Sequence, residues 1–245
     1  MSRFFSPPET ITEDLIELGP EETRHISKVM RLKAKDEITV FDGHKEYSGI
    51  IEKATPKKTI IRILSSRIHN LKNILNITLA IGLPKYKKMD LIIQKATELG
   101  VKEIIPLITQ RSIVDVRDKV IAKKMKRWQQ IAIAACKQSG RIDVPEIAYP
   151  MKFEDAVDVG SNFDVCFAGW VEEKSEIFRK YLDKARVSKK SKIFCFIGSE
   201  GGFSDQEIEL ALDKGIATVS FGQRVLRCET AAIYVLSALS FYLEG

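Results

Sequence analysis

A glycine-rich segment, Gly198-Ser199-Glu200-Gly201-Gly202, follows a short apolar run and precedes a helix signal. Three glycines in five residues let the backbone turn sharply and approach a ligand closely, with N–H and C=O groups free to hydrogen-bond. The spacing fits neither G-x-G-x-x-G nor G-x-x-x-x-G-K-[ST], which argues against a dinucleotide or P-loop site. A flexible connection is the alternative. We interpret the segment as one wall of a ligand pocket.

A second segment, Phe221 to Ala231, leaves a strand-like run through Gly222 and enters an apolar helix. Charges beside the hydrophobic start of a helix cost desolvation unless they pair or perform a function. For Arg224, helix capping or pairing is the better explanation. Arg227 and Glu229 are candidates for chemistry.

The elements that must position these segments begin at Ile77, where strands start to alternate with helices. This alternation predicts an α/β domain with a mainly parallel sheet and helices on both faces. Ligands in such sheets bind beyond the carboxyl ends of the strands, where both segments lie. The expected strands are Asn76–Leu83, Lys102–Ile108, Asp164–Ala168, Lys192–Ile197 and Ala217–Phe221, and the expected helices are Met89–Leu99, Lys119–Lys137, Ser204–Lys214 and Thr230–Leu243.

The first 70 residues read as short strands with one small helix, which predicts a β-barrel-like domain. Asp42-Gly43 suits a tight hairpin between two of the strands. The expected strands are Leu15–Leu18, Glu37–Phe41, Tyr47–Glu52 and Thr59–Leu64, the helix is Glu21–Met30, and the connector to the second domain is Ile68–Asn76.

The composition excludes several classes of protein. None of the apolar runs approaches the roughly 20 residues needed to cross a bilayer, and the N-terminus lacks a signal peptide's apolar region, so we expect a cytoplasmic protein. The histidines form no H-E-x-x-H motif and the cysteines no C-x-x-C, so we expect neither a metal site nor a disulfide framework. Buried free thiols are the expectation for Cys136, Cys166, Cys195 and Cys228.

The net charge of +6 is unevenly distributed. Residues 71–150 carry 15 Lys/Arg against 7 Asp/Glu, whereas residues 151–245 carry 12 against 15. A basic region of this kind suits a polyanionic partner such as nucleic acid, although a solvated basic helix is an equally good explanation of the charge alone.

Several blocks then combine into one resemblance. The glycine-rich loop, the Gly-x-Arg-hydrophobic-Leu-Arg-x-Glu-Thr-Ala pattern and the block Met89–Gly100 occur together, with Lys126-Arg127-Trp128, Lys137–Arg141, Arg24-His25 and Val29-Met30-Arg31. Over nearly its whole length the chain resembles the ribosomal RNA small subunit methyltransferase E family of the SPOUT class. Departures are few: Ser199 stands where the family usually has proline, and Phe221 and Val225 replace the commoner leucine and isoleucine.

The resemblance implies a fold and an activity. Residues 1–70 would form a PUA-like RNA-binding barrel, and residues 71–245 a SPOUT-type α/β domain with a parallel sheet and a trefoil knot. The family members are homodimers that use S-adenosylmethionine to methylate N3 of one uridine in the 16S rRNA of the small ribosomal subunit.

The resemblance also implies site residues. The cofactor would lie among three loops, Ala168-Gly169-Trp170, Gly198–Gly202 and Phe221–Ala231. Cofactor contacts are expected from Ala168, Gly169, Gly198, Ser199, Glu200, Gly201, Gly202, Phe221, Gly222, Val225, Leu226, Arg227, Thr230 and Ala231.

Uracil N3 is a neutral imide and must lose a proton before or during attack, so a base or an anion-stabilising cation is required. Glu200 and Glu229 are the candidate bases and Arg227 the candidate cation. Either glutamate could equally hold the cofactor or orient an arginine.

RNA contacts are expected mainly in the segment of residues 24–35, which holds six basic-type residues in twelve and no acid. A solvated helix face is the alternative, and the resemblance favours RNA backbone contact. The expected RNA-binding residues are Arg24, His25, Lys28, Arg31, Arg111 and Arg141.

Two other functions stay open. The same fold could methylate another RNA position, such as a ribose 2′-oxygen. A non-catalytic RNA-binding assembly factor is the other alternative, and the intact loop motifs argue against it.

Overall fold

The computed structural model describes residues 2–68, 75–85, 87–112, 117–171 and 175–244. The chain divides into two compact units, Met1–Lys72 with Ile133–Val144, and Asn73–Ala132 with Pro145–Gly245. Most of the expected connector, residues 69–74, lies outside the described residues.

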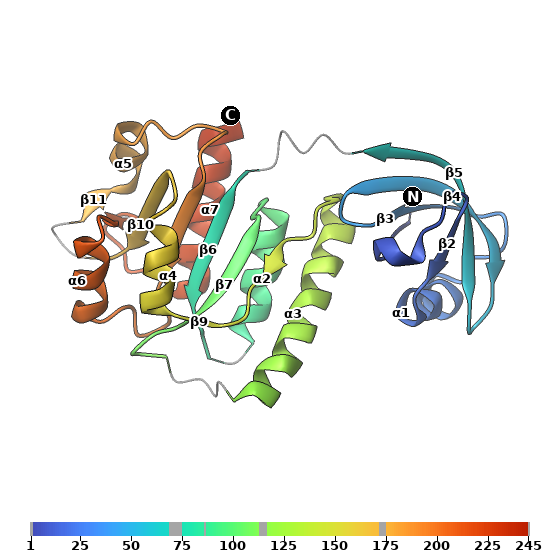
Figure 1. Cartoon of the computed structure of the whole chain (residues 1–245), viewed down its shortest axis with the longest axis horizontal. Helices are drawn as coiled ribbons and strands as arrows, with labels where there is room; N and C mark the ends of the chain where they lie inside the picture. Colours follow the sequence, from blue (N-terminus) through green and yellow to red (C-terminus); the bar gives the residue numbers. More distant parts are fainter. Residues whose placement is uncertain (1, 69–74, 86, 113–116, 172–174, 245) are drawn as a thin grey trace. The chain divides into compact units, whose positions relative to one another are not determined.

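The first unit is built on a five-stranded sheet with the order β1-β3-β4-β5-β2 (Figure 1). All four expected strands are confirmed, and β4 and β5 are longer than predicted. Irregular register at Ser48/Gly49 and Ile51/Lys53 interrupts the β4–β5 ladder, as β-bulges do where a sheet must bend. The strands are β1 (Arg3–Phe5), β2 (Leu15–Leu18), β3 (Glu37–Phe41), β4 (Lys45–Ala54) and β5 (Thr59–Ile68).

The expected hairpin joins β3 to β4. Gly43 has a φ of +100°, and the Asp42 carboxylate accepts hydrogen bonds from the backbone N–H groups of His44 and Lys45 at 2.7 and 2.6 Å. The Asp-Gly pair therefore closes the turn in the way its residue types predict.

The expected helix Glu21–Met30 is two pieces of different geometry. A short α-helix, α1 (Pro20–Arg24), runs into a π-helical turn, η2 (His25–Met30), which ends at Arg31 with a φ of +54°. π-Helical turns are rare and frequently occur at functional sites. A 3₁₀ turn, η1 (Pro8–Thr10), precedes β2.

The end of the long helix α3 (Asp118–Ser139) belongs to the first unit, which the sequence pattern did not predict. Cys136 and Ile142 form a buried cluster with Phe41. Lys137 pairs with Glu22 at 2.7 Å, so an ion pair as well as apolar packing attaches this segment.

The second unit contains a sheet of eight strands, and every pairing among them is parallel. The order is β11-β13-β10-β12-β6-β7-β8, with β9 also paired to β7. The strands are β6 (Ile77–Gly82), β7 (Glu103–Ile108), β8 (Glu146–Ile147), β9 (Met151–Lys152), β10 (Val165–Gly169), β11 (Glu176–Ile177), β12 (Ile193–Ile197) and β13 (Ala217–Ser220).

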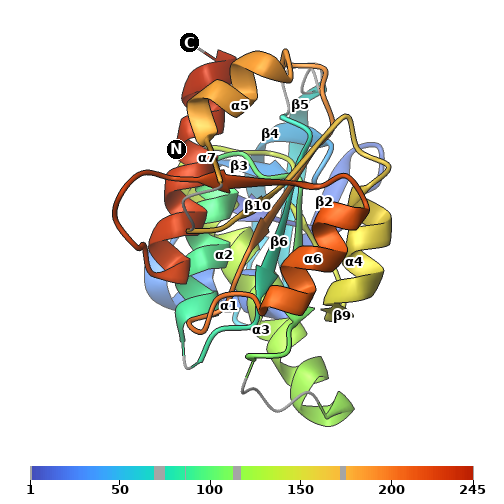
Figure 2. The same cartoon turned by 90° about the vertical axis from the view of Figure 1, so that its left-hand side faces the viewer.

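Helices cover both faces of this sheet, as the alternating pattern predicts. Figure 2 shows α2 and α7 on one face, and α4 and α6 on the other. Strand β12 is buried along its whole length, as expected for a central strand of a parallel sheet. The helices are α2 (Lys88–Glu98), α4 (Phe153–Gly160), α5 (Phe178–Lys184), α6 (Asp205–Asp213) and α7 (Cys228–Glu244).

Both loop-to-helix transitions that flank the predicted pocket are well defined. Ser204 caps α6 by accepting a hydrogen bond from the Glu207 backbone N–H, and the Glu207 carboxylate accepts one from the Ser204 N–H, which confirms the capping box. Helix α7 begins at Cys228, two residues before the expected start, so Glu229 lies in its first turn.

The pattern missed the shortest elements: β1, β8, β9, β11, α4 and α5. Helices of seven or eight residues and strands of two or three are too short for a hydrophobic period to repeat. Their formation depends on tertiary contacts, such as the packing of Phe153 against Phe196 and Phe203.

Three further observations bear on the class of protein. The four cysteines are free thiols, three buried and Cys166 half-buried. Among the described residues, no helix has the length and apolar character needed to span a membrane. The described part of the chain also holds no cluster of His, Cys, Asp or Glu arranged to bind a metal ion.

Phe196→Ala should lower the free energy of unfolding of the second unit by about 3–5 kcal/mol, the usual cost of removing a buried phenylalanine. Phe196 is fully buried, with its ring centroid 4.8 Å from that of Phe194. Urea denaturation of the full chain measures the change. Leu212→Ala, at an exposed position of α6, is the control and should cost about 0.5 kcal/mol or less. Equal effects of the two changes would contradict this core assignment.

Candidate functional site

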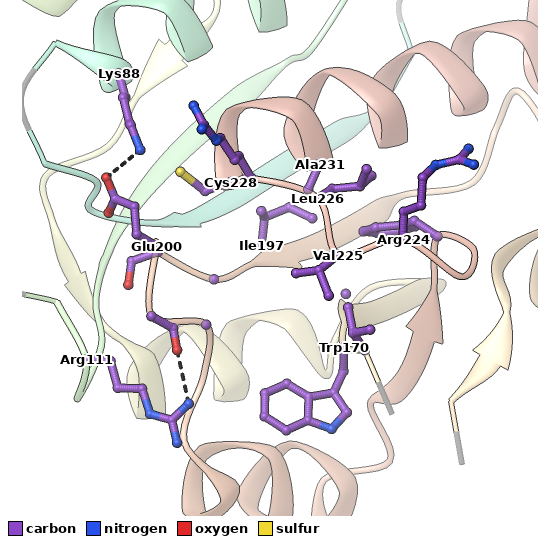
Figure 3. A pocket seen from close by; sticks show the side chains of 18 residues that line it. Lys88, Arg111, Trp170, Ile197, Glu200, Arg224, Val225, Leu226, Cys228 and Ala231 are labelled. Atoms are coloured by element: carbon purple, nitrogen blue, oxygen red, sulfur yellow. Dashed lines mark hydrogen bonds and ion pairs between the residues drawn. The ribbon is translucent and has the colours of Figure 1, made fainter. Parts of the chain in front are cut away.

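A cavity of about 540 Å³ lies at the carboxyl ends of β10, β12 and β13 (Figure 3). These strands are neighbours in the sheet, so the loops that follow them meet at one edge. The lining residues are Lys88, Arg111, Gly169, Trp170, Val171, Ile197, Gly198, Ser199, Glu200, Gly201, Gly202, Phe221, Arg224, Val225, Leu226, Arg227, Cys228 and Ala231.

The glycine-rich loop is a closed turn. The Gly202 N–H donates to the Ser199 carbonyl at 3.0 Å, and Gly202 has a φ of +68°, a conformation that favours glycine. A Cβ atom on Gly198 would lie 2.8 Å from the Gly202 Cα, so a side chain there would displace the backbone. These constraints favour a preformed ligand cradle over a flexible connection.

The aromatic side chains of Phe221 and Trp170 also line the cavity. The Phe221 ring packs edge-on against Phe178 at 5.3 Å and in a tilted arrangement against Tyr234 at 5.7 Å, which fixes the start of the loop after β13. Trp170, which follows β10, lies beside the glycine turn, since a Cβ atom on Gly202 would be 4.0 Å from its ring. With Ile197, Leu226 and Ala231 they give the cavity an apolar surface.

A charged group occupies one side of the cavity. The Lys88 Nζ lies 2.9 Å from the Glu200 Oε1 and 3.7 Å from the Glu229 Oε2. The Glu200 carboxylate also accepts the Lys85 backbone N–H at 3.1 and 3.3 Å. The Cys228 thiol donates to Glu229 at 3.1 Å. Three segments distant in the chain thus meet in one ion-paired cluster.

The cluster holds both carboxylates in their ionised form. Burial pushes the pKa of Glu200 up, but hydrogen bonds from Lys88 and from the backbone N–H groups of Glu200 and Lys85 outweigh it, and the pKa is lowered. Burial likewise opposes a net lowering of the Glu229 pKa. Its backbone hydrogen bond, the Cys228 thiol, and the charges of Lys88 and Arg227 produce that lowering.

The neighbouring groups complete the charge pattern. Hydrogen bonding to Glu200 raises the pKa of Lys88, an effect that desolvation partly opposes. Burial, and then the hydrogen bond to Glu229, raise the pKa of Cys228 to about 12, so this thiol stays protonated and is a poor nucleophile.

Among the described residues, three arginines line the cavity and differ in their contacts and exposure. The Arg111 guanidinium donates to the Gly201 carbonyl at 3.0 Å, which braces the glycine turn from outside (Figure 3). Arg224 and Arg227 are exposed, as is Val225, with four-fifths of its surface accessible.

The structure brings most of the expected cofactor residues together and leaves three out of the cavity lining. Eleven expected residues line it: Gly169, Gly198, Ser199, Glu200, Gly201, Gly202, Phe221, Val225, Leu226, Arg227 and Ala231. Ala168 is fully buried inside β10, and Gly222 and Thr230 are exposed outside the lining. Of the expected catalytic residues, Glu229 reaches the site through Lys88 and Cys228 and does not line the cavity.

Ser199 carries an unusual hydroxyl. The residue is 6% exposed, and its Oγ has no hydrogen-bond partner in the described structure. A buried polar atom without a partner costs free energy, so a hydroxyl in the wall of a cavity suits a ligand that supplies the partner.

The expected RNA-binding residues fall in both units. Arg24, Lys28 and Arg31 are exposed on α1, η2 and the residue after it, and His25 is half-buried. Arg111 lines the cavity of the second unit. Arg141 lies in the first unit, where its side chain is about one-tenth exposed and its Nε donates to Asp143 at 2.8 Å. This pairing favours a structural role for Arg141.

Sequence reasoning missed Lys88, Ile197 and Val171 among the lining residues. Trp170 and Cys228 lie in loops that were expected to hold the cofactor, and Arg224, which was expected to cap the helix or pair, lines the cavity as well. Lys88 directly precedes the family-like block Met89–Gly100, but nothing local distinguishes it from Lys85 or Lys87. Only the pairing of β6 beside β12 indicates that the loop before α2 must reach the glycine turn.

Comparison with known families agrees with this architecture. The profile described as "RNA methyltransferase domain" matches residues 71–240, and that described as "RNA methyltransferase PUA domain" matches residues 18–64. Ribosomal RNA small subunit methyltransferase E of Bacillus subtilis is 33% identical and aligns with 100% of this chain and 98% of its own length.

Solved structures show the same relationship. A Legionella pneumophila methyltransferase with bound S-adenosylmethionine has a TM-score of 0.89 and 36% identity, over 98% of this chain and 97% of its own. Ribosomal RNA small subunit methyltransferase E of Neisseria gonorrhoeae, also bound to S-adenosylmethionine, has a TM-score of 0.87 and 30% identity, over 99% and 98%. The SPOUT-type fold with a PUA-like first domain is thereby confirmed, and the trefoil knot stays a prediction. By the full-length match as well as by its loop motifs, this chain belongs to the ribosomal RNA small subunit methyltransferase E family.

Proposed function

We propose that this protein transfers a methyl group from S-adenosylmethionine to N3 of a uridine in 16S ribosomal RNA. The observation that carries the proposal is a preformed cavity at the carboxyl ends of three adjacent parallel strands, with a glycine cradle on one side and an ion-paired cluster on another. Two relatives of the same fold bind S-adenosylmethionine, which supports the choice of cofactor.

The cavity suits this cofactor on three counts. Its apolar wall of Ile197, Leu226 and Ala231 fits an adenine ring. The turn Ser199–Gly202 lets backbone groups approach a ligand closely, and the Ser199 hydroxyl needs a partner. We therefore assign cofactor contacts to the expected residues that line the cavity, whereas Ala168, Gly222 and Thr230 lie outside its lining.

The chemistry divides between cofactor and protein. The bound cofactor supplies an activated methyl group on a sulfonium. The protein must orient the uracil and favour loss of its N3 proton. We propose Glu229 and Glu200 as the groups that accept or guide this proton, and Arg227 as a cation for the resulting anion. The lowered pKa values of both glutamates weaken them as bases, so stabilisation of the anion must carry much of the effect.

We further propose that residues 1–70 form the RNA-binding domain and residues 71–245 the methyltransferase domain. Because N3 lies on the Watson–Crick edge, the target uridine must be unpaired or drawn out of its stack. The exposed cations Arg24, Lys28 and Arg31, with His25, form a basic surface on the first unit that suits the RNA backbone. Arg111 is the corresponding candidate beside the cavity.

We also propose that the protein acts as a homodimer in the cytoplasm, where small ribosomal subunits are made. Helix α7 carries large exposed side chains, Tyr234, Phe241 and Tyr242, and Phe241 is 83% exposed. Apolar surface of this kind on a folded unit suits burial by a second copy.

Reverse transcription on 16S rRNA tests the reaction. Methylation at N3 blocks base pairing, so a strong stop at one uridine should be absent when the gene is deleted and should return with the gene. An unchanged stop pattern would refute the uridine-N3 assignment. A pause seen only at low nucleotide concentration would indicate 2′-O-methylation, and failure to bind S-adenosylhomocysteine at millimolar concentration would indicate a non-catalytic factor.

Gly198→Ala should weaken S-adenosylhomocysteine binding by roughly ten- to hundredfold, because a Cβ 2.8 Å from the Gly202 Cα overpacks the cradle at a cost of about 1–3 kcal/mol. Isothermal titration calorimetry measures the affinity. Gly19→Ala is the control, since a Cβ there meets no atom within 4 Å, and it should leave the affinity unchanged. An undiminished affinity of Gly198→Ala would show that the turn does not form the cofactor site.

Replacing both Arg24 and Lys28 with alanine should weaken RNA binding. The slope of log affinity against log salt concentration should also become shallower by about one for each phosphate that the protein no longer neutralises. Filter binding at several salt concentrations measures both, with cofactor binding expected to stay intact. Lys53→Ala, an exposed lysine on β4, is the control. An unchanged salt slope in the double variant would place the RNA contacts elsewhere.

A further inference from the structure

Lys88 is a firmly held cation at the edge of the cavity. It is the first residue of α2, and Figure 3 shows its side chain directed toward Glu200. Its Nζ is 2.9 Å from Glu200 and 3.7 Å from Glu229. The Lys88 side chain is 30% exposed, so it is neither an internal core residue nor a freely solvated lysine.

The supports of Lys88 are themselves fixed. Glu200 is anchored by the Lys85 backbone N–H and belongs to the closed glycine turn. Glu229 lies in the first turn of α7 and accepts the Cys228 thiol. A cation held between two anchored carboxylates needs little reorganisation when a new negative charge forms beside it.

The geometry leaves hydrogen-bonding capacity on the ammonium. An ammonium has three N–H donors, and a donor–acceptor distance of 2.9 Å to Glu200 accounts for one of them. The 3.7 Å separation from Glu229 exceeds the usual range for a hydrogen bond. The ammonium can therefore donate to a carbonyl oxygen that enters the cavity without losing its bond to Glu200.

Protonation restricts what Lys88 can do. Its hydrogen bond to Glu200 raises its pKa, so it stays an ammonium at neutral pH and cannot accept the imide proton. The remaining roles are to hold an anionic part of the cofactor or to stabilise an anion on the substrate. The substrate role matches the chemical requirement, because loss of the N3 proton spreads negative charge onto the two carbonyl oxygens of uracil.

We propose that Lys88 is a catalytic residue that donates a hydrogen bond to a uracil carbonyl oxygen and stabilises the N3-deprotonated base, with Glu200 as its positioning residue. The inference rests on the proposed uridine-N3 activity and adds a residue to it. Lys88 is the most firmly held cation of the described cavity lining, because Arg111 is engaged with the Gly201 carbonyl and Arg224 and Arg227 are exposed, and it would act together with the proposed Arg227.

The proposed reaction consists of loss of the N3 proton followed by methyl transfer. The N3–H bond breaks and its proton passes to solvent, guided by the proposed Glu229 and Glu200 carboxylates, while the Lys88 ammonium stabilises the charge on the uracil oxygens. The N3 electron pair then forms the bond to the methyl carbon as the carbon–sulfur bond breaks, and those electrons stay on sulfur. Uracil returns to neutrality, and Lys88 keeps its protons throughout.

The test compares Lys88→Met with Lys88→Arg and with Lys95→Met as the matched control. Lys95 lies on the same helix, is ion-paired with Glu98 at 2.8 Å and does not line the cavity. Single-turnover methyl transfer to small ribosomal subunits from a deletion strain is measured at saturating cofactor, with S-adenosylhomocysteine affinity by calorimetry and folding by thermal melting.

Lys88→Met should lower the transfer rate by about 10²–10³-fold, the usual effect of removing one charge-stabilising donor. Its cofactor affinity should stay near that of the wild type, whereas loss of the charge between Glu200 and Glu229 should lower the melting temperature without unfolding the protein at the assay temperature. Lys88→Arg should recover most of the loss, and Lys95→Met should match the wild type. Glu200→Gln should lower the rate less than Lys88→Met does, because the ammonium is kept and only its position is loosened.

The pH profile provides an independent readout. A cation beside the uracil lowers the effective pKa of N3, so the wild-type rate should reach its plateau at a lower pH than the Lys88→Met rate. The ratio of the two rates should therefore shrink as pH rises, which a purely structural defect would not produce.

Three results would overturn the inference: an unchanged rate for Lys88→Met, a weakened cofactor affinity with an unchanged rate at saturation, or a rate ratio that does not vary with pH. The second result would make Lys88 a cofactor anchor. If the wild type itself leaves N3 unmethylated, the proposed function fails instead, and the wild-type arm of the experiment identifies that case.

Discussion

The parallel pairing of β12 with both β10 and β6 is the constraint on which the site depends. With β13 added beside β10, four carboxyl ends lie at one edge of the sheet, so loops that begin after residues 82, 169, 197 and 220 converge there. The buried side chains of β12 stabilise this order, and the ring packing of Phe194, Phe196 and Phe153 continues it to the helix on one face. Without this strand order, the glycine turn and the start of α7 would not meet at one edge of the sheet.

Electrostatics imposes the second constraint on the same edge. Two partly buried carboxylates, Glu200 and Glu229, lie close together, and Lys88 is a cation that meets both. Removing such a cation leaves like charges beside each other in a poorly solvated place, which is costly. The cluster therefore joins α2, the loop after β12 and the start of α7, and it prepares a charged surface beside an otherwise apolar cavity.

Much of the fold was predictable because its signals are local. Apolar runs such as Ile193–Ile197, the Ser204–Glu207 capping box and the Asp42-Gly43 turn each depend on a few consecutive residues. The short helices α4 and α5 and the two-residue strands have no such signal, since they form against neighbours that are far away in the chain. The π-helical turn His25–Met30 also escaped prediction, because its sequence reads as an ordinary helix.

The site residues also fall into those that local sequence signals predict and those that only the tertiary structure brings together. Residue type and spacing alone were enough to select the glycine turn and the arginine–glutamate segment, because a glycine that must accept a positive φ and a charge placed before an apolar helix are both visible locally. The membership of Lys88 in the site and the position of Glu229 outside the cavity lining were decided by tertiary structure. Each of these depends on which strands and helices become neighbours, and ion pairs between residues more than a hundred positions apart follow from strand order and not from any local pattern.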